Sequence, residues 1–217
     1  MRSQQSGFTL VEIAIVLVII GLLLGGILKG QELINSAKVK NLANDFRVIP
    51  TYIYAYQDKF RSLPGDDTAA ISHVGATALQ GATPPAGNGV INGLWNSATN
   101  TDESFIFWQH VRLANLAAGP TDPADANYRP KNAVGGFLGI SSATSAQLQI
   151  TGMTGTYQVC SMGILGKFAK QLDVQMDDGQ ETTGSMRSVP DGSAMGTAAT
   201  AITAAQEADP YTVCMTF

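Results

Sequence analysis

The sequence predicts an α+β protein in which a long N-terminal helix, first transmembrane and then amphipathic, packs on a small and mainly antiparallel sheet. Residues 13–28 contain no charged or hydrogen-bonding side chain, and a helical stripe of apolar residues follows them. Short apolar runs bounded by Gly, Asp and Ser occupy the last third of the chain and are typical of strands. The chain therefore divides into an apolar helix and a loop-rich globular part.

Residues 8–28 predict a transmembrane helix. The segment is long enough to cross the hydrocarbon core of a bilayer, and Glu12 is its only ionisable group. A cleavable secretory signal is the main alternative. However, Arg2 is the only charged residue before the apolar run, and no A-x-A-like cleavage site ends the run before Lys29. Both observations favour a membrane anchor.

Residues 31–60 predict an amphipathic continuation, so that one helix extends over residues 8–60. Apolar side chains recur at alternating steps of three and four residues. They are Val39, Leu42, Phe46, Ile49, Ile53, Tyr56 and Phe60. Leu63, Pro64 and Gly65 then end the helix. We expect the apolar stripe to pack on the globular head, which residues 61–217 form.

The head is expected to contain a second helix over residues 102–117 and five strands. The predicted strands are residues 148–150, 157–160, 172–176, 186–189 and 211–215. Asp177-Asp178-Gly179 is interpreted as a hairpin turn that leads back through Met186.

Charge and motif content argue against nucleic-acid binding and against catalysis. The formal net charge is −4, and no Lys/Arg cluster is interleaved with aromatic residues, so nucleic acid is not expected as the primary partner. His73 and His110 lie in unrelated contexts. The sequence also shows no phosphate-binding glycine loop and no metal-ligand spacing. The chain is therefore not expected to be an enzyme.

Cys160 and Cys214 both lie far downstream of the apolar segment. If that segment anchors the chain, both cysteines lie on the exported side, where disulfides form. Two cysteines allow one pairing, and closing a loop of that length stabilises a fold by about 4 kcal/mol in the chain-entropy model. We therefore expect a disulfide, with two unpaired buried thiols as the alternative.

Glu12 is the most informative residue of the apolar segment. A carboxylate within an apolar transmembrane helix costs about 2.5–3.5 kcal/mol on insertion scales, so it needs a partner or a position near the membrane surface. A headgroup position close to the helix start, where the helix dipole favours negative charge, would explain why Glu12 is tolerated. It would not explain why a glutamate is present.

Gly7, followed by FTLVE and the apolar run, resembles the cleavage and methylation signature of type IV prepilins and type II secretion pseudopilins. That signature combines a short leader ending in Gly, a Phe at the new N-terminus and a Glu as the fifth residue of the mature chain. The resemblance implies a pilin-like fold and covers roughly the first thirty residues. It also implies that residues 1–7 are a leader peptide.

The resemblance assigns a role to each residue of the signature. Prepilin peptidase would cut between Gly7 and Phe8 and then methylate the amine of Phe8. Glu12 would neutralise the Phe8 amine of a neighbouring subunit during assembly. Gly at the cut position is reasonable, because a side chain there would obstruct the approach of the peptidase to the backbone.

The function implied by the resemblance is that of a structural subunit of a type IV pilus-like filament. Its partners would be identical or related pilin subunits, prepilin peptidase and an inner-membrane assembly platform. The chain would span the inner membrane once before assembly, and lie in a surface pilus or a periplasmic pseudopilus afterwards. The alternative within the family is a pseudopilin or minor pilin of a type II secretion or DNA-uptake machine. An anchored periplasmic binding module that never polymerises also stays open.

Asp173, Asp177 and Asp178 support a hypothesis of structural calcium, because hard cations prefer clustered oxygen ligands. The spacing of an EF-hand is absent, so an ordinary acidic turn is the competing interpretation. No other cofactor is expected.

Overall fold

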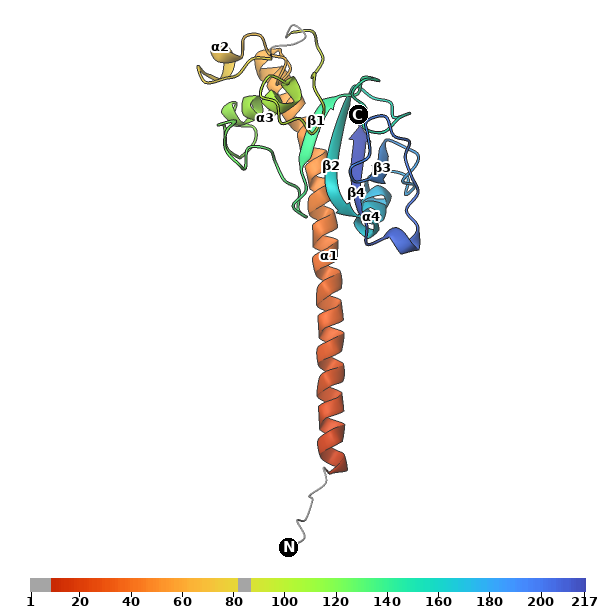
Figure 1. Cartoon of the computed structure of the whole chain (residues 1–217). Coiled ribbons are helices and arrows are strands. Elements are labelled where there is room, and N and C mark those ends of the chain that lie inside the picture. The colour runs from red at the N-terminus through yellow and green to blue at the C-terminus, as the bar shows by residue number, and fades with distance from the viewer. Residues whose placement is uncertain (1–8, 82–86) are drawn as a thin grey trace. The chain divides into compact units, whose positions relative to one another are not determined.

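The computed structural model describes residues 9–81 and 87–217, and it divides the chain into two compact units, Met1–Lys38 and Val39–Phe217. Helix α1 (Leu10–Phe60) has residues in both units, and the other elements belong to the second one (Figure 1). A long apolar N-terminal helix and a small antiparallel sheet confirm the predicted α+β class and fit a pilin-like layout.

Residues 10–28 of α1 form a helix of mostly Ile, Val, Leu and Gly. β-Branched residues are only moderate helix formers in water, and glycine is a poor one. In a bilayer, by contrast, every backbone N–H and C=O must be bonded within the chain, so an isolated apolar segment adopts a helix. The environment therefore explains the helix better than intrinsic propensity does.

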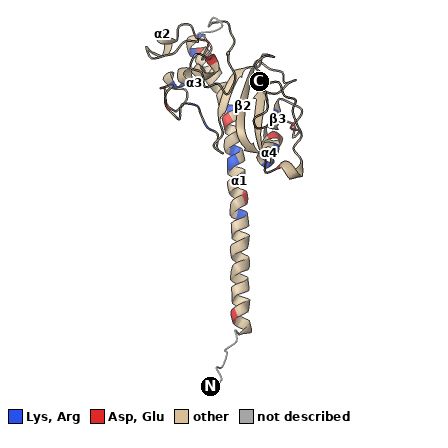
Figure 2. Cartoon of the chain, in the orientation of Figure 1, with Lys and Arg blue, Asp and Glu red and all other residues tan. Residues whose placement is uncertain are grey.

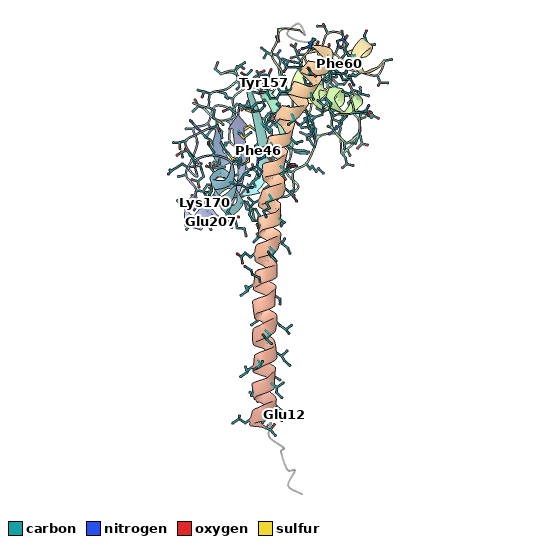
Figure 3. All side chains as sticks on the ribbon, turned by 180° about the vertical axis from the view of Figure 1, so that it is seen from behind. Glu12, Phe46, Phe60, Tyr157, Lys170 and Glu207 are labelled. Carbon is teal, nitrogen blue, oxygen red and sulfur yellow. A yellow bond between two sulfur atoms is a disulfide. The ribbon has the colours of Figure 1, made fainter. Side chains whose placement is uncertain are left out.

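The second half of α1 buries one stripe of side chains. The stripe consists of Val39, Leu42, Ala43, Phe46, Ile49, Ile53 and Tyr56. Each of these residues is at most 4% exposed, and Phe46 lies where the helix passes the sheet (Figure 3). The predicted amphipathic stripe is confirmed over these positions, whereas Phe60 at its end is only half-buried.

Helix α1 ends because the next residue adopts a left-handed conformation. Arg61 has φ 57°, and its N–H donates to the carbonyl of Gln57 at 2.8 Å, as expected at a helix C-terminus. Pro64 follows shortly after and cannot continue a helix. The boundary at Phe60 is thus determined by local backbone geometry.

The sheet has four strands in the order β1-β2-β4-β3, and all neighbours are antiparallel. The strands are β1 (Leu138–Ser142), β2 (Tyr157–Leu165), β3 (Met186–Pro190) and β4 (Pro210–Thr216). The predictions at residues 157–160, 186–189 and 211–215 are confirmed as parts of β2, β3 and β4. The last strand of the chain is therefore inserted between two earlier ones.

Two strand predictions are wrong. Residues 172–176 belong to helix α4 (Gly166–Met176), so the acidic run that follows ends a helix and is not a hairpin turn. The buried side chains Phe168 and Leu172 are four residues apart and share one face of that helix. At residues 148–150, only Ile150 pairs, in an isolated parallel bridge with Thr197. Strand β1 was not predicted.

Three further helices belong to the part of the head that the structure describes. They are α2 (Ala70–Val74), α3 (Glu103–Leu113) and the 3₁₀ helix η1 (Ala204–Gln206). Helix α3 confirms the predicted helix within residues 102–117. It contributes Phe107, Trp108 and Val111 to the core that also contains the α1 stripe.

The two faces of the sheet pack against different clusters. One face carries Val159 and Val213 and joins the larger core, which includes side chains of α1, α3 and α4. The opposite face carries Cys160 and Cys214, packed with Trp95 in a smaller cluster. The two cysteines are register partners in β2 and β4, and they form the expected disulfide with an S–S distance of 2.04 Å. The disulfide thus links the last strand to the centre of the sheet.

Loops of the same chain bond to both edge strands. The N–H of Ser142 in β1 donates to the carbonyl of Ile91 at 3.0 Å. In β3, Ser188 donates its N–H to Glu181 and accepts a hydrogen bond from the N–H of Thr200, both at 3.0 Å. Edge groups that are bonded internally do not serve as templates for another strand. Association through the sheet edges is therefore disfavoured.

Candidate functional site

A capping box formed by Thr9 and Glu12 closes the N-terminus of α1. Glu12 Oε2 accepts hydrogen bonds from the backbone N–H and from the hydroxyl of Thr9, both at 2.7 Å. The N–H of Glu12 donates in return to Thr9 Oγ1 at 3.3 Å. These bonds satisfy N–H groups that the first turn of a helix leaves without partners. Glu12 therefore has a structural role within its own subunit.

The contribution of Thr9 was missed in the sequence, although a signal for it was present. Thr9 and Glu12 are three residues apart and precede an apolar helical run, which is the spacing of a capping box. The two residues proposed for cleavage, Gly7 and Phe8, lie outside the described residues. The structure therefore places Glu12 but not the amine that the resemblance pairs with it.

The side chains that follow Glu12 form a continuous apolar surface. Large apolar residues along this part of α1 are exposed, from 46% at Ile20 to 85% at Leu10. No charged residue lies between Glu12 and Lys29 (Figure 2). Helix α1 is the one helix of residues 9–81 and 87–217 that is long and apolar enough to cross a membrane. An exposed apolar surface of this extent requires lipid or another protein to cover it.

The three acidic residues considered for calcium converge where α4 ends. Their ligand oxygens lie within 4.8 Å of one another. The carboxylates of Asp173 and Asp177 accept backbone N–H groups of Gly179 and Met186 at 2.7 and 2.8 Å, and Asp178 accepts the hydroxyl of Thr183 at 2.7 Å. The cluster therefore organises the connection from α4 to β3.

Burial changes the titration of one member of this cluster. Asp173 is 2% exposed, and burial raises its pKa to about 6. The N–H of Gly179 opposes this shift, whereas the charges of Asp177 and Asp178 add to it. Burial thus moves the pKa of Asp173 from the usual acidic range towards neutral pH.

A buried polar network connects α1 to the loop after it. The hydroxyl of Tyr56 donates to Asp67 Oδ2 at 2.7 Å, and His73 Nδ1 lies 2.7 Å from the same oxygen. Burial alone would raise the pKa of Asp67, but the hydrogen bonds from His73 and Tyr56 hold it below its usual value. His73 therefore serves as a partner for a buried carboxylate.

His110 is a buried structural residue of α3. The N–H of Gly65 donates to His110 Nδ1 at 3.0 Å, so the ring hydrogen is on Nε2, which lies 2.8 Å from the carbonyl of Leu79. Burial lowers the pKa of His110, which favours this neutral form. Both histidines thus have structural partners within the head.

The comparisons with known proteins identify the N-terminal segment. Residues 2–28 match the family model of the prokaryotic N-terminal methylation motif. Searches of curated proteins and of solved structures found no match. The matched region includes the capping box and most of the exposed apolar surface of α1. Residues 2–28 therefore carry the type IV pilin and pseudopilin signature, which marks a substrate of prepilin peptidase.

Proposed function

We propose that this chain is a structural subunit of a type IV pilus-like filament and that it polymerises through α1. The observation that carries the proposal is the exposed apolar surface of residues 10–28, which directly follows the Thr9–Glu12 capping box within the methylation motif. Internal hydrogen bonds along β1 and β3 also disfavour polymerisation through sheet edges. The helix is therefore the element best suited to assembly.

Processing comes first in the proposed sequence of events. Prepilin peptidase cuts between Gly7 and Phe8, removes the leader of residues 1–7 and methylates the amine of Phe8. The mature chain then consists of a helix over residues 8–60 and a head over residues 61–217. Before assembly, residues 8–28 span the inner membrane and the head lies on the exported side, where the Cys160–Cys214 disulfide forms.

In this proposal, Glu12 forms an ion pair with a neighbouring subunit during assembly. Within the part of the chain that the structure describes, its hydrogen bonds are to Thr9 and use Oε2, which leaves Oε1 for a second donor. The ammonium of Phe8 in a neighbouring subunit would be that donor. The capping box holds the carboxylate at the helix end while the neighbour arrives, so Thr9 is a positioning residue for this contact.

The Cys160–Cys214 disulfide favours a pilus subunit over a pseudopilin, because a disulfide-bounded C-terminal region is more typical of pilin heads. The alternative remains a pseudopilin or minor pilin of a type II secretion or DNA-uptake machine. The assembly partners of either would be identical or related subunits and an inner-membrane platform. Long surface filaments would identify a pilus, and a short periplasmic assembly would identify the alternative.

Two substitutions of Glu12 test the role of its charge. Glu12→Gln retains a side chain that forms a capping box but removes the charge, and Glu12→Ala removes both. Leaving one member of a buried charge pair without its partner costs about 3–5 kcal/mol. We therefore expect both variants to be cleaved and inserted but to yield at least about tenfold fewer sheared filaments.

The matched control is Glu32→Gln, which removes an exposed carboxylate that contacts Lys29 at 2.6 Å on the same helix. This variant should assemble normally. Thr9→Ser, which keeps the capping hydroxyl, should do the same. Filament yields of Glu12→Gln equal to those of the control would contradict the charge contact.

A further inference from the structure

Glu103 is a fully buried carboxyl group at the start of α3. It is 0% exposed, and its Oε2 accepts the backbone N–H of Asn92 at 2.8 Å and the side-chain amide of Asn92 at 2.9 Å. Its Oε1 is also buried and accepts no hydrogen bond from any residue that the structure describes. A buried acceptor without a donor is unfavourable. The carboxyl group of Glu103 is therefore only half satisfied.

A second buried carboxylate, Asp66, lies beside Glu103. Asp66 is 4% exposed, and a loop of backbone N–H groups surrounds it. Gly87 and Asn88 donate to Oδ1, the latter at 3.1 Å, and Gly89 donates to Oδ2 at 2.7 Å. The side chains of Asp66 and Glu103 are within hydrogen-bonding distance of each other. Two ionised carboxylates in contact away from water repel strongly, so one of them must be neutralised.

A proton fits this pair better than a metal ion does. Both oxygens of Asp66 and Oε2 of Glu103 already accept N–H groups, which leaves Oε1 as the one open oxygen among the four. Calcium requires six to eight oxygen ligands. A proton on Glu103 Oε1 would instead donate to Asp66 and would satisfy the open oxygen with a single hydrogen bond.

The surroundings of Glu103 favour its protonated form. Burial raises the pKa of Glu103 to about 7, and the charge of Asp66 adds to this shift, whereas the hydrogen bonds from Asn92 oppose it. Asp66 accepts three backbone N–H groups, so neither of its oxygens lacks a donor. The open oxygen Oε1 and the raised pKa both point to Glu103 as the group that carries the proton.

We propose that Glu103 and Asp66 share one proton and that this pair is a pH switch for the loop of residues 87–93. The loop holds both partners, because Gly87 to Gly89 bind Asp66 and Asn92 binds Glu103. Loss of the proton places two negative charges side by side beneath the loop. The loop then loosens, because separation of the carboxylates requires it to move.

Other charged and titratable groups near the pair come from α1, the loop after it, α2 and β2. Asp66 borders a cavity of about 440 Å³ together with Arg61, Tyr157 of β2 and Gly87 of the loop. Arg61 is exposed, and Tyr157 is buried. The adjacent Asp67 is bonded to Tyr56 and His73, as described above. Movement of the loop would therefore alter one wall of this cavity.

Stability as a function of pH tests the switch. The pKa of folded Glu103 is raised, so its stabilising contribution is complete below the unfolded pKa and is lost as pH rises through about 7. The unfolding constant of the full chain in detergent should therefore rise about tenfold more between pH 6 and pH 8 than that of Glu103→Gln. The glutamine amide can donate to Asp66 at every pH and so replaces the proton.

Glu181→Gln, a half-exposed glutamate of the same head, is the matched control and should keep the pH slope of the unmodified chain. Equal slopes for the unmodified chain and Glu103→Gln would overturn the proposal. If Glu103→Gln does not fold, a carbon-detected NMR titration of the glutamate carboxyls in the unmodified chain decides the question. One glutamate must titrate near pH 7, and the absence of such a group would overturn the proposal.

Two further measurements distinguish a shared proton from a bound cation at the pair. Amide hydrogen exchange of residues 87–93, corrected for its intrinsic pH dependence, should accelerate between pH 6 and pH 8 in the unmodified chain but not in Glu103→Gln. The melting temperature at pH 8 can be measured with calcium and with chelator. If calcium raises it and chelator reverses the rise in the unmodified chain, but not in Glu103→Gln, a cation occupies the pair. That result would overturn the assignment to a proton.

Discussion

Two parts of the same helix, residues 10–28 and residues 39–56, are both rich in apolar residues but have opposite surroundings. In the first part, large side chains such as Leu22 are 73% exposed, whereas in the second part Phe46 is 0% exposed. The difference lies in how the apolar residues are distributed around the helix axis. A helix that is apolar on all sides needs lipid or other subunits around it, and a helix with one apolar stripe packs on its own domain.

This comparison shows how one helix serves two purposes. The stripe of the second part contributes to the larger core of the head, so substitutions there affect folding of the single chain. The exposed surface of the first part has no such role in the head, so we expect substitutions there to affect membrane insertion and the proposed assembly. Substitutions in the helix and in the head test this separation, and we describe them in order of decreasing effect.

Truncation of an apolar side chain should have very different effects in the two parts of α1. Phe46→Ala should lower the free energy of unfolding of the head by about 3–5 kcal/mol, because it leaves a cavity in the core. Leu22→Ala should change it by less than about 0.5 kcal/mol. Urea unfolding of the full chain in detergent, followed by tryptophan fluorescence, measures both values. Similar losses in the two variants would contradict the separation.

The disulfide should stabilise the head by almost as much as the side chain of Phe46 does. The double variant Cys160→Ala/Cys214→Ala opens a loop with a sequence separation of 54 residues and leaves no unpaired thiol. We expect a loss of about 4 kcal/mol in the same unfolding measurement. Insertion of residues 10–28 into membranes should be unaffected, and carbonate extraction of membranes can establish this. A variant as stable as the unmodified chain would show that strand pairing alone holds β4 in place.

The polar network at the end of α1 should have a smaller effect. Tyr56→Phe removes the hydroxyl that donates to the buried carboxylate of Asp67, which should cost about 1.5–3 kcal/mol. Tyr54→Phe is the matched control, because Tyr54 is 58% exposed on the same helix, and it should be neutral. Thermal melts of the two variants side by side provide the comparison. Equal melting temperatures would mean that the hydrogen bond contributes nothing net.

The smallest predicted effect concerns pH and Asp173. Its raised pKa of about 6 means that its stabilising contribution is complete below the unfolded pKa and is lost as pH rises through about 6. The chain should therefore lose about 1 kcal/mol of stability between pH 5 and pH 7 through this group. Asp173→Asn should remove that part of the slope, whereas Asp58→Asn, at an exposed position of α1, should retain it.

The sequence pattern was sufficient for α1 because its periodicity extends over many turns. It failed at residues 172–176, where Leu172, Val174 and Met176 alternate as in a strand. In the structure Leu172 is fully buried and Val174 is 71% exposed, as expected for a helix, in which residues two apart do not share a face. Short apolar runs do not separate the two structures by period alone. Strand β1 escaped prediction because it is short and contains Gly139 and two serines.

The candidate site was predictable only where it is local in sequence. The cleavage signature and Glu12 lie within one short segment, and the T-x-x-E spacing of the capping box was also visible there. The pairing of Glu103 with Asp66 depends on tertiary contacts between α3, the loop after α1 and residues 87–93. No periodicity or motif in the sequence connects these segments.

In the proposed function, the chain is cut, methylated and assembled into a filament. Intact mass spectrometry of protein sheared from the surface of its native cells, in parallel with the membrane fraction, tests this claim most directly. We predict an abundant sheared species that begins at N-methylated Phe8. Its mass should be two hydrogens lower than that of the reduced chain, because of the Cys160–Cys214 disulfide. An uncut chain that begins at Met1 or Arg2 and occurs only in membranes would contradict it.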